Sequence, residues 1–210
     1  MANHQNQFLD QLVGDLKPVT PIEKDGPALM KALSLSFAAI GGYLYLMGAF
    51  ENVDLMWMNA VFYAQIVLIG MTFGICTWLS VKMARPEARM TWKVIGLASL
   101  PLLGMVALLV YGWMTEAPGG PMSMKRAHCT YEIFVMGWLP IVMLLGRLRK
   151  GYPTESRRLA LTMGLAGVSL PVGFMHFACF YQPKHVLIYH LGPALVIVAI
   201  VFFIGRKLWR

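Results

Sequence analysis

The clearest structural signal in this chain is one long apolar stretch, WMNAVFYAQIVLIGMTFGICTWLSV, at residues 57–81. It contains no Asp, Glu, Lys or Arg. A helix needs roughly 20 mostly apolar residues to cross the hydrocarbon core of a bilayer, and this run exceeds that length. We therefore predict a transmembrane helix here. Gly70 and Gly74 form a GxxxG pair within it, which favours close packing against a neighbouring helix of the same bundle over homodimerisation.

Five further apolar stretches of similar length lie on either side of this one. The chain is 58% hydrophobic and only 13% charged, which leaves too little polar surface for a soluble domain. The sequence lacks the segments of about ten residues, with alternating apolar and polar side chains, that are typical of membrane β-strands. We predict an all-α integral membrane protein with six transmembrane helices, at about residues 29–50, 57–81, 91–114, 131–148, 159–181 and 186–205.

The residues before the first apolar stretch form a separate region. Residues 1–28 are mostly polar, so we expect no cleaved signal peptide. The predicted organisation is a cytoplasmic tail over residues 1–28, followed by a six-helix membrane domain over residues 29–210.

The basic residues gather on one side of the predicted membrane. With six alternating helices, all but three of the 18 Lys and Arg residues fall on the side of both termini, the exceptions being Lys125, Arg126 and Lys184. Basic loops stay in the cytoplasm, so we expect both termini to be cytoplasmic in a bacterial inner membrane. The net charge of +8 then reflects this bias and contact with anionic lipid, and predicts no direct nucleic-acid binding.

The tail carries a segment unlike the rest of the chain, FLDQLVGDLKPVTP at residues 8–21. Its apolar residues fall within a helical stripe about 140° wide: Phe8, Leu9, Leu12, Val13 and Leu16. Asp10 and Asp15 lie on the other side, and Pro18 and Pro21 end the pattern. We predict a short amphipathic helix whose acidity suits a protein partner better than an anionic leaflet. The alternative is a disordered tail with a nascent helix.

Cysteine, histidine and one carboxylate gather at the predicted outer side. Cys129 begins one helix there, and His176 and Cys179 are three residues apart near the end of the next. His185 lies in the short outer turn. The candidate sensing or metal-binding residues are Cys129, Cys179, His128, Glu132, His176 and His190.

Three interpretations of these residues stay open. Cys129 and Cys179 are a possible disulfide pair in an oxidising compartment. Together with histidine, and with Glu132, they are also a possible transient site for a soft metal. The third interpretation is structural, with cysteine packing as a small apolar residue and histidine lying at the membrane interface.

Other function classes are less well supported by the sequence. Transporters usually have ionisable residues near the middle of the membrane, and the predicted helices lack them. Four of these helices are interrupted by proline, as transporter helices often are: Pro101, Pro140, Pro171 and Pro193. A small-solute or metal transporter remains the alternative. We find no CxxC, HExxH, phosphate-binding loop or Ser/His/Asp arrangement, so we expect neither an enzyme nor a required cofactor.

Several short motifs together resemble a known family. LVGDLKPVTP precedes the membrane helices, and the second half contains Cys129 with Glu132, Pro140, RKGYP at residues 149–153, Cys179, and YHLGP at residues 189–193. In order and spacing they resemble the NrsF-type membrane anti-sigma factors, which hold an extracytoplasmic-function (ECF) sigma factor at the inner membrane. The resemblance covers nearly the whole chain.

This resemblance implies roles for both ends of the protein. The tail would bind the sigma factor through a set of apolar, acidic and proline residues: Phe8, Leu12, Asp15, Leu16, Pro18, Val19 and Pro21. Cys129 and Cys179 would be the thiols that sense heavy-metal or oxidative stress. Two positions differ from the family pattern, because Thr20 replaces an expected basic residue and Cys179 is not followed directly by proline.

Overall fold

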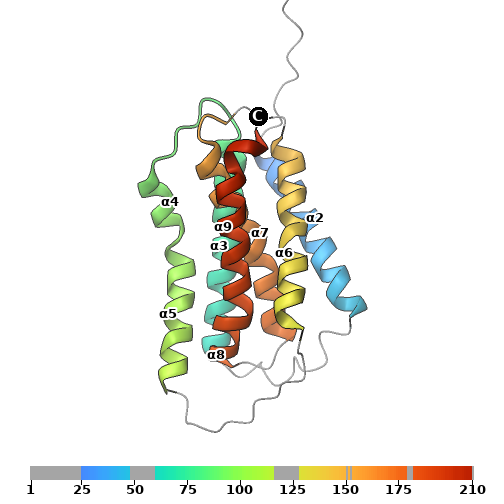
Figure 1. The fold of residues 1–210 in the computed structure, drawn as a ribbon, viewed down its shortest axis with the longest axis vertical. Coiled ribbons are helices and arrows are strands. Elements are labelled where there is room, and N and C mark those ends of the chain that lie inside the picture. The colour runs from blue at the N-terminus through green and yellow to red at the C-terminus, as the bar shows by residue number, and fades with distance from the viewer. Residues whose placement is uncertain are drawn as a thin grey trace, which may run out of the picture.

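The computed structural model describes residues 25–47, 60–115, 128–149, 151, 153–178 and 182–209. These residues fold into a bundle of helices (Figure 1). The elements in chain order are α2 (Asp25–Leu46), α3 (Ala60–Met83), α4 (Trp92–Ala98), α5 (Leu100–Thr115), α6 (Cys129–Leu148), α7 (Ser156–Ala178), α8 (Pro183–His185), η2 (Val186–Leu191) and α9 (Gly192–Leu208).

Most of these helices suit a bilayer in length and composition. Among the described residues, four are long and apolar enough to cross one, and the bent pair of α4 and α5 makes a fifth if it is one span. The apolar part of α2, Leu33–Leu46, is shorter. The predicted all-helical class with apolar helices that fit membrane insertion is therefore confirmed. The count of six spans stays a prediction.

The predicted span over residues 91–114 is not one straight helix. It consists of α4 and α5, which meet at a bend of 42°. Pro101 has no amide N–H to continue the helical ladder. The Ser99 hydroxyl donates to the Ile95 carbonyl at 2.9 Å, a hydrogen bond that favours bending of a helix. The interruption that Pro101 predicts is thus found in the structure.

Helix α7 forms the centre of the bundle. Within its apolar 18-residue stretch, 83% of the residues are buried inside the bundle, against 39% for each of the other three long helices. It packs against α3, α6 and α9. The hydroxyl groups of Ser80 on α3 and Thr162 on α7 also lie 2.9 Å apart and hydrogen-bond within the bundle. Both polar groups are therefore satisfied away from lipid.

Glycine allows the closest helix contacts, although not at the glycines that the sequence pattern indicates. A Cβ atom on Gly167 would collide with Ile141 of α6, and one on Gly137 would lie 2.7 Å from the Ile197 side chain. Gly70 and Gly74 have no such neighbour within 4 Å among the described residues. The prediction that the GxxxG pair packs against a helix of the bundle is therefore wrong for the described part of the chain.

We expect the substitution Gly167→Leu to destabilise the bundle by about 3 kcal/mol, because an overpacked interface must separate α6 from α7. The measurement is the fraction of detergent-solubilised protein that stays monodisperse after heating. Gly70→Leu is the matched control, because the residue is exposed and has open space around it. Equal loss in both variants would contradict the assigned contact.

The two ends of the bundle differ in chemistry. The start of α2, the α3–α4 connection, the α6–α7 connection and the C-terminal end of α9 lie together at one end, at the top of Figure 1. The start of α6 and helix α8 lie at the other end. Among the described residues, the elements that carry the basic residues assigned above to the cytoplasmic side meet at the first end. Which compartment it faces stays a prediction.

Candidate functional site

Helix α6 begins at Cys129, which places a thiol at the first turn of the helix. His128 precedes it with non-helical backbone angles (φ −104°, ψ 4°), and the Glu132 amide donates to the His128 carbonyl at 2.8 Å. The Cys129 side chain is buried, with 2% of its surface exposed. The N-terminal end of a helix carries a partial positive charge, so this position stabilises a negatively charged sulfur.

The segment opposite Cys129 is a π-helix, η2, which is rare in proteins and common at functional sites. Its cause lies in the sequence, because Pro193 has no N–H for the Tyr189 carbonyl and its ring excludes a normal helical turn there. The chain widens instead, and the Gly192 amide donates to the Leu187 carbonyl five residues earlier. Helix α9 then begins at Gly192.

This wide turn brings two histidines to one side of the chain. His185 and His190 are five residues apart, which in an α-helix would separate them by about 140° around the axis. The wider turn of a π-helix, with its i→i+5 hydrogen bonds, brings residues five apart much closer to the same side. The two imidazole rings accordingly meet with their centroids 5.1 Å apart. His190 is fully buried, and His185 is half-buried.

Cys129, His185 and His190 form a compact group of metal-ligating atoms. The sulfur and one ring nitrogen from each histidine all lie within 4.8 Å of one another. Donors around a tetrahedral Zn²⁺ lie about 3.3 to 3.6 Å apart, as bond lengths of about 2.0 to 2.3 Å require. Side-chain adjustments of about 1 Å would therefore enclose an ion. We call these three residues the Cys/His cluster.

His176 adds a third imidazole beside the Cys/His cluster. It is 2% exposed, and its ring centroid lies 6.1 Å from that of His190. Its Nδ1 lies 3.0 Å from the Val172 carbonyl oxygen. A carbonyl only accepts hydrogen bonds, so Nδ1 carries the proton and Nε2 of the neutral ring is left as an acceptor. The centroid of the Phe62 ring lies 6.4 Å from that of the His176 ring.

Several imidazole nitrogens here have no conventional partner. The Nε2 atoms of His176 and His185 and both nitrogens of His190 are buried without a hydrogen-bond partner among the described residues. A buried polar group without a partner costs roughly 1 to 3 kcal/mol. Four such nitrogens close together are unusual for a region that serves only packing, because buried polar atoms in proteins nearly always have hydrogen-bond partners.

The start of η2 is held in place by the contacts of helix α8, which directly precedes it. Helix α8 packs against α5, and the Lys184 ammonium lies 5.7 Å from the centre of the Trp113 ring at the end of α5. The Tyr189 ring lies 4.9 Å from that of His185. These contacts fix the short turn that carries His185 against the rest of the bundle.

The structure brings together some of the residues singled out from the sequence. Cys129 and His190 lie in the Cys/His cluster, and His176 lies beside His190. His128 is exposed, and Glu132 is half-buried one turn along α6. The remaining candidates lie outside the described residues: Cys179 and the tail residues Phe8, Leu12, Asp15, Leu16, Pro18, Val19 and Pro21.

His185 is the cluster member that sequence reasoning missed. Its spacing from His190 matches no α-helical face, and it was assigned only to a turn. The signal that points to it is the Gly192–Pro193 pair, which follows His190 after one residue, because proline at this position predicts a distorted turn.

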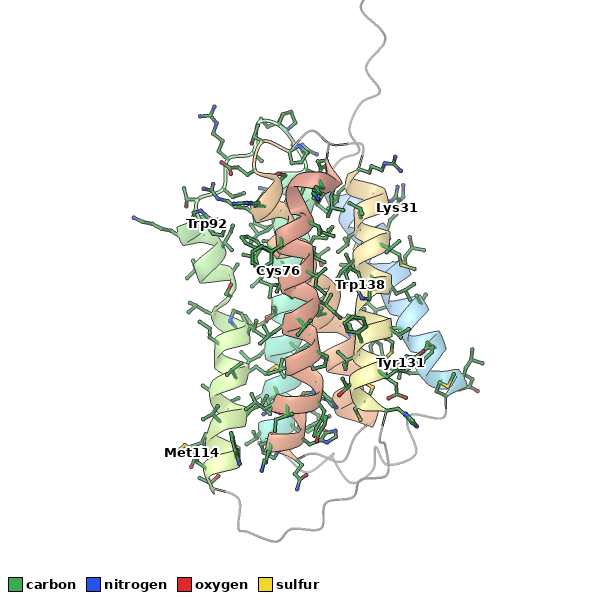
Figure 2. The ribbon with its side chains drawn as sticks, viewed as in Figure 1. Lys31, Cys76, Trp92, Met114, Tyr131 and Trp138 are labelled. Carbon is green, nitrogen blue, oxygen red and sulfur yellow. The ribbon has the colours of Figure 1, made fainter. Side chains whose placement is uncertain are left out.

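The opposite end of the bundle is held by an arginine. The Arg158 guanidinium donates to the Met90 carbonyl at 2.6 Å, pairs with Glu155 at 3.2 Å and stacks on the Trp92 ring at 5.0 Å. Trp92 and Cys76 both lie toward this end, far from Tyr131 near the start of α6 (Figure 2). Cys76 is fully buried and is not part of the Cys/His cluster.

Together these features define a small helical protein whose apolar helices fit a membrane, with a buried Cys/His cluster at one end and basic side chains at the other. The model of the family NrsF, described as negative regulator of sigma F, matches residues 12–210, and the chain belongs to this family. The family description implies a sigma factor as partner. No curated protein and no solved structure matches the chain.

Proposed function

We propose that this protein is an inner-membrane anti-sigma factor. In this proposal the tail sequesters an ECF sigma factor on the cytoplasmic side, through Phe8, Leu12, Asp15, Leu16 and the prolines that follow. Heavy-metal or oxidative stress at the Cys129 and Cys179 end then releases it. The observation that carries the proposal is the family match over nearly the whole chain. It also favours regulation over the transporter alternative.

The packing of α6 supports communication between the two ends. At one end Cys129 meets His185 and His190, which lead directly into α9. At the other end of the same pair of helices, the Trp209 ring N–H donates to the Leu148 carbonyl at 3.4 Å. Because helices are stiff, a shift of Cys129 relative to His190 changes how α6 lies against α9 along its length.

Helix α2 connects this movement to the tail. It follows the tail directly in the chain and packs against α6. A displaced α6 therefore changes the position or the stability of the helix from which the tail extends. This is a two-state mechanism, in which stress favours the state that holds the sigma factor more weakly.

The test is capture of the ECF sigma factor encoded beside this protein by the full chain in detergent. We expect a stable complex that weakens as salt rises, because the tail is acidic. Cd²⁺ or an oxidant should then release the sigma factor. A full chain that captures no sigma factor under any of these conditions would contradict the proposal.

A further inference from the structure

We propose that Cys129, His185, His190 and His176 form a site for a Zn²⁺-class transition-metal ion, with the thiolate and three imidazoles as ligands. This inference deepens the proposed function by naming the ligand class at its sensing end. It rests on that proposal only for its regulatory consequence, because the geometry of the site is independent of any sigma factor.

The donor set fits such an ion in kind and arrangement. Cysteine sulfur and histidine nitrogen are the usual protein ligands of tetrahedral Zn²⁺, and Co²⁺ accepts the same ligands. The Cys/His cluster supplies three donors within 4.8 Å of one another. Carboxylate-rich surroundings would favour Mg²⁺ or Ca²⁺ instead, and Glu132 on the next turn of α6 is not part of the cluster.

His176 is prepared to complete the site. Histidine ligands of metals usually donate their second ring N–H to a carbonyl or carboxylate, which fixes the ring and leaves the other nitrogen for the metal. The contact between His176 Nδ1 and the Val172 carbonyl has this form. The remaining Nε2 is buried without a partner among the described residues, and the ring faces His190.

The site would join three parts of the bundle at one point. Cys129 comes from α6, His176 from α7, and His185 and His190 from the segment that leads into α9. An ion bound here ties these helices together near the end of the bundle. A thiolate bound to this ion is also unavailable for a disulfide with Cys179, so a filled site favours metal binding over the disulfide.

The experiment is titration of the purified, metal-free full chain in detergent with Co²⁺, followed by absorption spectroscopy. We expect one ion per chain, a thiolate-to-cobalt charge-transfer band and the visible bands of tetrahedral Co²⁺, all removed by Zn²⁺. Cys129→Ala should abolish the charge-transfer band. His185→Ala and His190→Ala should weaken Co²⁺ binding about 100-fold or more, and His176→Ala about 10-fold or more.

His128→Ala is the matched control, because this exposed histidine neighbours Cys129 and lies outside the cluster. It should bind Co²⁺ like the unaltered chain. Unchanged binding in the His185 and His190 variants, or no Co²⁺ binding by a monodisperse unaltered chain, would overturn the inference. Sigma-factor capture by the same metal-free samples separates the two proposals: capture without Co²⁺ binding overturns only the metal site, and Co²⁺ binding without capture overturns only the anti-sigma function.

Discussion

The double substitution Leu12→Ala, Leu16→Ala is expected to weaken binding of the sigma factor by at least about 100-fold. Two leucines that anchor an amphipathic helix in a partner's groove contribute about 1.5 to 3 kcal/mol each. Their combined loss corresponds to two or more factors of ten in Kd. The measurement is calorimetry or surface binding with the full chain in detergent, with Kd compared at one fixed salt concentration.

The matched control for this result is Gln11→Ala, which changes the polar side of the same predicted helix. It should leave Kd within about twofold of the unaltered chain, because solvated surface positions contribute little. Asp15→Ala should weaken binding about tenfold at low salt and less at high salt, because its contribution is electrostatic. Equal Kd values for the leucine variant and the control would contradict the assignment of the tail as the binding element.

Replacing both Cys129 and Cys179 by serine is expected to remove stress induction, so that a reporter driven by the sigma factor stays at its repressed level with Cd²⁺ or oxidant. Serine keeps the size of cysteine but forms neither a disulfide nor a strong bond to a soft metal. A ligand without differential affinity for two states shifts no equilibrium between them. The sigma factor would therefore remain bound.

Cys76→Ser provides the control within the same chain. Cys76 is buried in α3 toward the opposite end of the bundle, as Figure 2 shows. Serine is tolerated there because its hydroxyl can donate to the carbonyl four residues earlier in the helix. This variant should show normal induction. Full induction in the Cys129/Cys179 double variant, with normal protein levels in the membrane, would exclude the thiols as the receptor.

The sequence predicts features that depend on the solvent or on local backbone chemistry. Apolar stretches such as residues 57–81 indicate helices, because a backbone in lipid must satisfy its own hydrogen bonds. Pro101 likewise predicts the break between α4 and α5, because the missing N–H is a local property. Among the described helices, these inferences agree with the structure.

Which side of each helix faces its neighbours follows from the packing of the bundle and not from the sequence pattern. A helix that is apolar on every side gives no signal about which side meets its neighbours, because lipid is as apolar as the interior of the bundle. The close contacts accordingly lie at Gly137 and Gly167, while Gly70 and Gly74 of the GxxxG pair have open space among the described residues.

The amino-acid pattern alone indicates that this protein is helical and apolar, that it belongs with the negative regulators of sigma factors, and that Cys129 and His190 are candidate ligands. Only the tertiary structure joined His185 to them and placed His176 beside them. One physical reason is that a π-helical turn changes which residues lie on the same side of the helix. The other is that α6, α7 and η2 are distant in sequence and come into contact only in the folded bundle.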